Sequence, residues 1–416
     1  MAVKAGASIV TNNLLFAYDT NNQFRSYFGP PVSNIVGDTS LAGGNWAKNY
    51  CTSIDLDADT DKPPGIKKNV VSWLNDGTVG GAHPASAAFW YNYNDDTPQA
   101  DNTTYTISLW VKTFGQDISV RAYTADNQET GRHNTNTITV PGDGKWHRCE
   151  WNSFTTTNPT DSDSLSFRFH NGNFVPENQR VYMCAPQMTP ASYHIPFVDG
   201  SLSTSTSIKD WTGKRTITRV GTITDNSDLT FEFGAPANAA KLEIDDPSYP
   251  SAWTDPFSFE VWHYVPSGAD WEDESSFGTE SDATATAIMA RGSYNGSIGL
   301  GRSDTQSFRH IIRTDSELSS VIFASASFDT WYHLVGTWDG TNNLLYVNGK
   351  LEASDTVNVS GVPDSGIVKV GGNHAFGGNN GGYAEGKTPI ARMYNKALTA
   401  SEVKQNFNAT RSIYGV

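Results

Sequence analysis

Long hydrophobic runs and positive charge are both scarce in this chain of 416 residues. No stretch approaches the roughly 18 apolar residues of a membrane-spanning helix, so we expect no membrane insertion. The 29 Lys and Arg residues face 44 Asp and Glu residues, which gives a formal net charge of −15. Because an acidic surface repels phosphate backbones, we also expect no nucleic-acid partner.

Cysteine is equally scarce. Cys51, Cys149 and Cys184 are the only three, and none lies in a Cys-x-x-Cys pair. The spacing therefore excludes a zinc ribbon and a thioredoxin-like redox motif. We expect buried free thiols, with a single disulfide as the alternative. The apolar stretch within residues 1–10 is too short for a secretory signal peptide, so we expect no export signal.

The composition favours an all-β fold. Charged residues make up 18% of the chain and aromatic residues 12%, and there are 37 glycines. Exposed helices need more Glu, Lys, Arg and Ala than this, whereas short strands and polar turns suit Ser, Thr, Asn, Gly and aromatic side chains. Turn signals recur about every 8–12 residues, a spacing typical of sandwiches. We therefore predict two jelly-roll or β-sandwich domains.

The clearest strands alternate apolar and polar residues. Residues Tyr105–Val111 place Tyr105, Ile107, Leu109 and Val111 on one face, and Phe257–Trp262 repeats the pattern. Asn348–Gly349 predicts a type I′ hairpin turn, because both positions need positive φ. Further strands are expected at 165–169, 307–313, 320–323 and 344–347.

One short helix is predicted near the C-terminus. Thr399 and Glu402 fit the capping-box pattern, in which each side chain satisfies a free backbone N–H group. Val403 and Phe407 follow at a spacing that places them on one face. We expect the helix to end at Asn408.

Composition also divides the chain into domains. The polar tract 201–207 is suited to a linker between a domain at 46–200 and a second at 208–416. Residues 1–45 are predicted to form an N-terminal arm. It would hold one or two strands, such as Leu14–Tyr18, and dock on the first sandwich or on a partner.

The second half resembles a known family. Trp331–Gly340, followed by Leu345–Gly349, is similar to the laminin-G-like branch of the concanavalin A-like lectin/glucanase superfamily. Phe257–Trp262 and Ile390–Thr399 fall where that family has matching strands and its closing motif. The resemblance covers 208–416 and implies a jelly-roll sandwich of two antiparallel sheets. In the family these residues are mainly scaffold, so they indicate fold and not function.

Two further resemblances bear on function. Residues 46–196 look like jelly-roll carbohydrate-binding modules, and Val181–Gln187 is similar to the segment at the last strand of those modules. Ile9–Asp19 and Tyr394–Phe407 resemble virion structural proteins of tailed bacteriophages. That resemblance implies a capsid decoration or tail-fibre component, assembled in the host cytoplasm and exposed on the particle. Its partners would be other virion proteins, further copies of itself (as in a trimer) and host-surface glycans.

Enzymatic signatures are missing from the sequence. Glucanases of the superfamily carry Glu-x-Asp-x-x-Glu, whereas here Glu243 and Asp245 are followed by Ser248 in place of the second glutamate. No Gly-x-Ser-x-Gly or His-Glu-x-x-His motif occurs, and His147 and His333 are interpreted as core histidines. We expect no catalytic activity. A glycan depolymerase, with a carboxylate pair drawn from distant strands, is the alternative.

Exposed aromatic residues are the main signal for glycan binding. In the run 89–95 consecutive aromatic residues cannot all face one core, because alternate residues of a strand point to opposite faces. The glycine-rich loop 371–382 and its border form a second candidate rim. The glycan-binding candidates are Trp90, Asn92, His374, Phe376 and Tyr383. Packing against a neighbouring subunit, as in a structural cement protein with no glycan ligand, would explain exposed aromatics equally well.

Calcium is the one cofactor that the laminin-G resemblance implies. Asp245, Asp246 and Asn373 carry the oxygen ligands that hard cations prefer. No spacing rule selects them, and a surface turn without a metal is the alternative.

Overall fold

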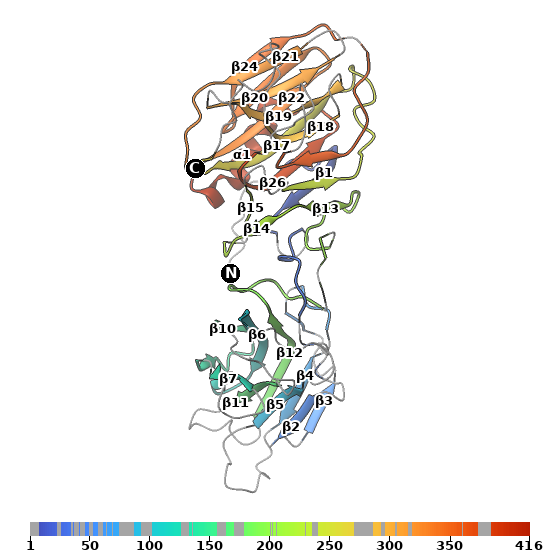
Figure 1. Ribbon diagram of the computed structural model, residues 1–416. Helices are drawn as coiled ribbons and strands as arrows, with labels where there is room; N and C mark the ends of the chain where they lie inside the picture. Colours follow the sequence, from blue (N-terminus) through green and yellow to red (C-terminus); the bar gives the residue numbers. More distant parts are fainter. Residues whose placement is uncertain are drawn as a thin grey trace. The chain divides into compact units, whose positions relative to one another are not determined.

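The computed structural model describes residues 8–22, 26–34, 36, 41, 46–49, 53–56, 61–63, 65–68, 70–74, 87–92, 102–125, 133–134, 136–155, 164–169, 179–199, 201, 203–204, 206–228, 230–234, 240–269, 286–292, 296–303, 306–314, 318–359, 361–372 and 384–416. The chain forms two compact units (Figure 1). Met1–Gly29 and Thr204–Val416 make one, here called the C-terminal unit. Pro30–Ser203 makes the other, the inserted unit. The return to the C-terminal unit falls inside the expected linker 201–207.

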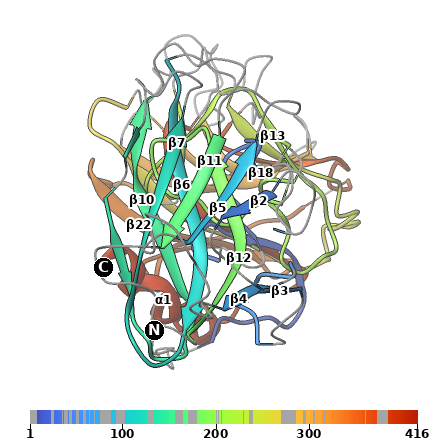
Figure 2. The same cartoon turned by 90° about the horizontal axis from the view of Figure 1, so that it is seen from below.

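The inserted unit contains two antiparallel sheets (Figure 2). The five-stranded sheet has the order β10-β6-β12-β4-β3, and the six-stranded sheet has the order β2-β5-β11-β7-β8 with β9 also paired to β7. The strands are β2 (Trp46–Asn49), β3 (Ser53–Leu56), β4 (Val71–Leu74), β5 (Ala87–Asn92), β6 (Thr104–Thr113), β7 (Ile118–Ala125), β8 (His133–Asn134), β9 (Ile138–Val140), β10 (His147–Thr155), β11 (Ser164–Phe169) and β12 (Arg180–Thr189).

The core of the inserted unit confirms the predicted alternation. Tyr105, Ile107, Leu109 and Val111 of β6 are all buried in one cluster. That cluster also holds residues of the six-stranded sheet, such as Phe167 of β11. The two sheets therefore pack face to face, which leaves the alternate residues of β6 on the outer face of the five-stranded sheet.

The C-terminal unit also contains two antiparallel sheets. The eight-stranded sheet has the order β14-β15-β26-β17-β22-β23-β24 with β1 also paired to β26, and the seven-stranded sheet has the order β13-β16-β25-β18-β19-β20-β21. The strands are β1 (Leu14–Asp19), β13 (Ile217–Val220), β14 (Ile223–Asp225), β15 (Phe231–Phe233), β16 (Lys241–Ile244), β17 (Phe257–Val265), β18 (Thr286–Arg291), β19 (Ile298–Ser303), β20 (Ser307–Arg313), β21 (Leu318–Phe323), β22 (Thr330–Trp338), β23 (Asn342–Val347), β24 (Lys350–Thr356), β25 (Val368–Val370) and β26 (Gly386–Tyr394).

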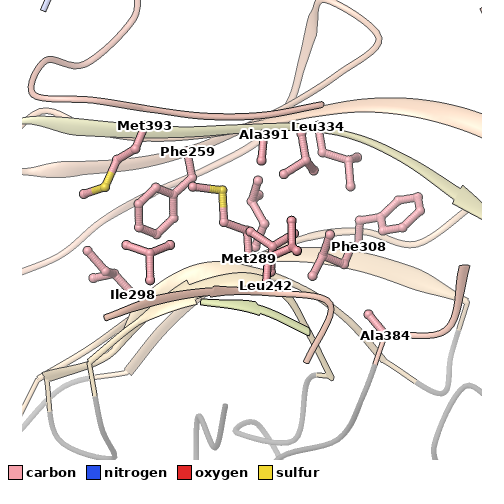
Figure 3. Close-up of a cluster of buried hydrophobic side chains, with 14 of the residues drawn as sticks. Leu242, Phe259, Met289, Ile298, Phe308, Leu334, Ala384, Ala391 and Met393 are labelled. Carbon is pink, nitrogen blue, oxygen red and sulfur yellow. The ribbon is translucent and has the colours of Figure 1, made fainter. Parts of the chain in front are cut away.

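Side chains from both sheets fill the space between them (Figure 3). Phe259 of β17 and Met393 of β26 meet Met289 of β18 and Phe308 of β20 in this layer. Because Phe257, Phe259 and Val261 point inward, Glu260, Trp262 and Tyr264 occupy the outer face of the eight-stranded sheet. The strands predicted at 257–262 and 307–313 are confirmed.

The single helix among the described residues is α1 (Ala400–Tyr414), and it is too short and polar to cross a membrane. Its predicted capping box is confirmed, with Thr399 and Glu402 bonded reciprocally. The predicted end at Asn408 is wrong, because α1 continues to Tyr414 and stops at Gly415 in the left-handed conformation. Contacts of its last turns with the sheet explain the extra length.

The expected N-terminal arm divides between the units. Leu14–Asp19 is a strand, but it pairs with β26 of the C-terminal unit, so docking on the first sandwich is wrong. The Val10 backbone N–H donates to Asn406 Oδ1 of α1 at 2.7 Å, and the Ala17 N–H donates to Asp210 Oδ1 at 3.0 Å. Residues from Pro30 onward belong to the inserted unit.

Two smaller expectations are also settled. Asn348 and Gly349 have φ of 49° and 77°, as the predicted hairpin turn requires. Cys149 is a buried free thiol, as expected, and burial raises its pKa to about 12. Cys184 is also buried. Cys51 lies outside the described residues.

Candidate functional site

The sequence-predicted glycan residues fall largely outside the described part of the chain. Trp90 and Asn92 lie in β5, where the backbone places Trp90 opposite Ser166 and Asn92 opposite Ser164. For these two residues the structure describes the backbone and not the side chain. His374, Phe376 and Tyr383 lie outside the described residues. Their role in glycan binding stays a prediction.

The predicted calcium ligands are described in part. The Asp245 carboxylate accepts the Thr216 N–H at 3.0 Å, and Asp246 Oδ1 accepts the Ser248 N–H at 2.8 Å and Arg291 Nη2 at 3.2 Å. Asn373 lies outside the described residues. No group of three His, Cys, Asp or Glu side chains suited to a metal ion occurs within the described ranges. Calcium binding therefore stays a prediction.

The two histidines interpreted as core residues differ. His333 of β22 is fully buried, as predicted, although its partner Glu260 was not foreseen. His147 is not a core residue: its side chain is 32% exposed and its Nε2 lies 2.9 Å from Asp143 Oδ1. It stands at the first position of β10, where the strand meets solvent.

A row of aromatic rings crosses the outer face of the eight-stranded sheet. β17 and β22 pair so that Tyr264 lies opposite Trp331 and Trp262 opposite His333. The ring centroids of Tyr264 and Trp331 are 5.1 Å apart, and Tyr414 at the end of α1 lies 4.5 Å from Trp331. Tyr414 is also 4.5 Å from Trp262, which is fully buried. We call Tyr264, Trp331 and Tyr414, all partly exposed, the aromatic surface.

Polar side chains border the aromatic surface. The Tyr264 hydroxyl donates to Asp329 Oδ1 at 3.0 Å, and Asn21 Nδ2 donates to the Tyr414 hydroxyl at 3.1 Å. Lys387 Nζ lies 6.0 Å from the centre of the Tyr264 ring and 3.4 Å from Asp228 Oδ2. The border therefore offers a carboxylate, an amide and an ammonium group beside the same set of rings.

The border is predominantly acidic. Burial raises the pKa of Tyr264, and the hydrogen bond to Asp329 and the charges of Asp329 and Glu232 raise it further. Burial also raises the pKa of Tyr414 well above its usual value, and the charges of Asp19 and Asp228 raise it further. Four carboxylates thus raise the pKa of one or the other of these phenols, and the charge of Arg392 lowers that of Tyr414.

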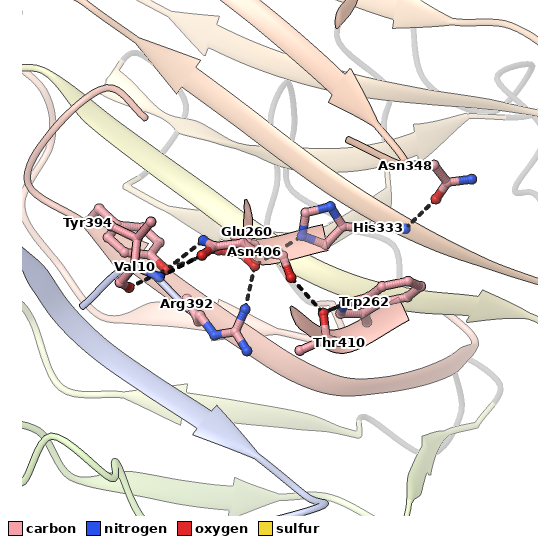
Figure 4. A network of polar contacts seen from close by, with 9 residues as sticks. All are labelled: Val10, Glu260, Trp262, His333, Asn348, Arg392, Tyr394, Asn406 and Thr410. Atoms are coloured by element: carbon pink, nitrogen blue, oxygen red, sulfur yellow. Dashed lines mark hydrogen bonds and ion pairs between the residues drawn. The ribbon is translucent and has the colours of Figure 1, made fainter. Parts of the chain in front are cut away.

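A buried polar network holds the helix that carries Tyr414 (Figure 4). Glu260 of β17 is fully buried and pairs with Arg392 of β26. Its carboxylate also accepts His333 Nε2 at 3.0 Å, the Tyr394 hydroxyl at 3.1 Å and Asn406 Nδ2 of α1 at 2.7 Å. One carboxylate therefore links strands β17, β22 and β26 to helix α1.

The charge of Glu260 is maintained in spite of its burial. Burial raises the pKa of this carboxyl, but the Arg392 charge and the His333 hydrogen bond outweigh burial and lower the pKa to about 2. A second contact, from Trp262 Nε1 to Thr410 Oγ1 at 2.8 Å, fixes α1 one turn further along. The position of Tyr414 on the aromatic surface depends on both contacts.

Sequence reasoning missed most of the aromatic surface. Tyr264 continues the alternation of Phe257–Trp262, so its outward direction was readable from the sequence. Trp331 was interpreted as scaffold only, and Tyr414 lay beyond the predicted end of the helix. No pattern in the sequence indicates that β17 pairs with β22, because four strands of the other sheet, β18 to β21, lie between them in the sequence.

Comparison with known proteins assigns the fold of this unit. Residues 236–404 match the family model of the concanavalin A-like lectin/glucanases superfamily. All of them lie in the C-terminal unit, which is a concanavalin A-like domain. No curated protein matches the sequence.

Solved structures show similarity over part of the chain. The serotype C1 botulinum neurotoxin binding domain is 15% identical, with a TM-score of 0.36 over 47% of each chain. The receptor-binding domain of botulinum neurotoxin D is 12% identical, with a TM-score of 0.37 over 50% of each chain. Botulinum neurotoxin type C, whose cell entry depends on two ganglioside molecules, is 13% identical, with a TM-score of 0.36 over 47% of this chain and 46% of that one. The chain spans about half the length of these neighbours.

Proposed function

We propose that this protein binds carbohydrate without cleaving it, and that the aromatic surface of the C-terminal unit holds a sugar ring. The adjacent rings of Tyr264, Trp331 and Tyr414, bordered by hydrogen-bonding groups, carry the proposal. The apolar face of a sugar packs on aromatic rings, and its hydroxyl groups pair with carboxylate, amide and ammonium groups. The match of residues 236–404 to a lectin and glucanase superfamily supports the same ligand class.

Binding without catalysis is favoured by the placement of the carboxylates. Hydrolysis of a glycosidic bond needs two carboxyl groups that flank the substrate. Glu260, the carboxylate of the network, is fully buried and engaged by Arg392, so it is out of reach of a sugar. Glu243 of the glucanase-like segment pairs with Lys241 at 3.2 Å.

The experiment is glycan-array binding of the full chain, followed by calorimetry on the best neutral ligand. Trp331→Ala is expected to weaken binding by about tenfold or more, because it removes the central ring of the row. Trp331→Phe should keep part of the affinity. Neutral sugars should bind better than sialylated ones, because Asp228, Glu232 and Asp329 repel a ligand carboxylate.

Val362→Ala is the matched control, since Val362 is 64% exposed in the same unit and lies outside the aromatic surface. It should bind as the unaltered chain does. Thermal melting of each variant separates lost binding from lost folding. If folded Trp331→Ala binds every glycan with unchanged affinity, this surface is not the sugar site.

We further propose that the protein acts on the surface of a phage particle, with other virion proteins and further copies of itself as partners. The support is the resemblance of Ile9–Asp19 and Tyr394–Phe407 to virion structural proteins. These two stretches are neighbours in the fold, because β1 pairs with β26 and Val10 bonds Asn406. The resemblance therefore concerns one contiguous part of the C-terminal unit.

The virion proposal predicts that antibodies against the purified chain label phage particles released by lysis. Label over the head would indicate a capsid decoration, and label at the tail would indicate a fibre component. Unlabelled particles, together with chain left in the cleared lysate, would contradict the proposal and leave carbohydrate binding standing.

A further inference from the structure

A second group of partly exposed aromatic side chains lies on the outer face of the five-stranded sheet, within the inserted unit. Lys112 of β6 stands opposite Tyr182 of β12. Phe114 follows β6 directly and pairs with Asp143, and Trp146 precedes β10. The register thus brings three rings from three segments around one lysine.

Lys112 orders these rings. Its ammonium nitrogen lies 4.9 Å from the ring centre of Trp146, 5.3 Å from that of Tyr182 and 5.7 Å from that of Phe114. The side chain is only 3% exposed, and Nζ is 3.5 Å from Asp61 Oδ2. A cation enclosed by several ring faces is attracted to each of them, so the rings are held in fixed positions before any ligand arrives.

Phe114 presents a fixed apolar ring to solvent. It is 54% exposed, the highest value among the exposed aromatic side chains of the described residues. The ring meets Tyr182 edge-on, with centroids 5.9 Å apart. Gly144 lies directly against it: a Cβ there would be 2.6 Å from Phe114 Cε1, and φ of +74° already disfavours other residues. Phe114 is therefore supported from below although it fills no core.

Hydrogen-bonding groups lie beside the exposed ring. The Asp61 side chain is 74% exposed, and its backbone carbonyl accepts Trp146 Nε1 at 2.7 Å. Asp143 is 37% and His147 32% exposed, with Asp143 Oδ1 and His147 Nε2 2.9 Å apart. A fixed ring with carboxylate and imidazole groups at its border suits a hydroxyl-rich ring with one apolar face.

We propose that Phe114 and its border form a second sugar-binding site, so that each chain carries one site on each unit. The occupant is a hexose residue of a glycan, stacked on Phe114 with hydroxyl groups bonded to Asp61 and to the Asp143–His147 pair. The proposal extends the proposed function but depends on different residues, all within Pro30–Ser203. Two sites on one chain strengthen attachment to a glycan-covered surface by raising the effective concentration of the second contact.

The test compares the full chain with Phe114→Ala, Trp331→Ala and the double variant on one array of neutral hexose and N-acetylhexosamine oligosaccharides. Phe114→Ala is expected to lose tenfold or more in affinity for at least one oligosaccharide that Trp331→Ala still binds. Phe114→Tyr, which keeps the ring, should retain that binding. The double variant should bind neither set.

Each remaining outcome separates the two sites. Folded Phe114→Ala that binds every oligosaccharide as the unaltered chain does would overturn the second site, while a loss in Trp331→Ala would keep the first. Loss in Phe114→Ala with no change in Trp331→Ala would keep the second site and overturn the first. Absence of binding by the unaltered chain would overturn both.

Discussion

Replacing Glu260 by alanine is expected to lower the free energy of unfolding of the C-terminal unit by about 3–5 kcal/mol. The variant leaves Arg392, only 1% exposed, without the carboxylate that pairs with it. It also removes the acceptor for His333, Tyr394 and Asn406. Because domains are stable by only about 5–15 kcal/mol, the loss is a large fraction of the total. Urea denaturation followed by tryptophan fluorescence measures it.

A double variant separates the charge from the hydrogen bonds. Glu260→Gln combined with Arg392→Met removes both members of the ion pair and keeps an acceptor for Asn406. It is expected to be more stable than Glu260→Ala, because an unpaired buried charge costs more than a pair replaced by neutral groups. Equal destabilisation by both variants would mean that packing, and not the stranded Arg392 charge, accounts for the loss.

Glu352→Ala provides the matched surface control. Glu352 pairs with Lys350 at 2.9 Å, but the lysine side chain is 77% exposed. Such pairs contribute about 0–1 kcal/mol, so the free energy of unfolding should hardly change. A loss of stability in Glu352→Ala comparable to that in Glu260→Ala would show that urea denaturation does not resolve the contribution of the network.

The Glu260→Ala variant should also bind sugar more weakly, since loosening α1 displaces Tyr414 from the aromatic surface.

The predictable parts of this fold are those with local causes. The alternation in Tyr105–Val111 and the capping box at Thr399 depend on residues a few positions apart, and both are confirmed. The helix end was predicted too early because its last turns are stabilised by tertiary contacts, such as Thr410 with Trp262. Local propensity does not contain those contacts.

The candidate sites escaped prediction for a similar reason. Tyr264 and Trp331 meet only because β17 pairs with β22, and Lys112 meets Tyr182 only because β6 pairs with β12. These pairings join strands that are far apart in the sequence, and no local motif in a single sequence indicates which distant strands pair. Sequence patterns indicated which residues leave the core, but the structure shows which of them meet.

Removal of β1 is expected to prevent cooperative folding of the C-terminal unit. A chain of residues 204–416 contains the whole family match at 236–404, yet it lacks Phe16 and Tyr18, both fully buried in the core of this unit. It also exposes the edge of β26 that β1 covers. Loss of each buried aromatic side chain costs about 3–5 kcal/mol, and the sum approaches the whole stability of a domain. Calorimetry of this chain should therefore show no sharp transition.

The control keeps β1 and omits the inserted unit. The Phe28 N–H donates to the Ser207 carbonyl at 2.9 Å, and Tyr27 pairs with Ile208. The segment that leaves the C-terminal unit and the segment that returns to it therefore lie side by side within that unit. A short Gly/Ser loop in place of residues 30–203 can therefore close the C-terminal unit, and that chain should melt in one cooperative transition. If residues 204–416 alone melt just as sharply and at the same temperature, β1 is dispensable. If only the chain with β1 does so, the folding unit is discontinuous in sequence, and the domain boundary expected at 208 divides it.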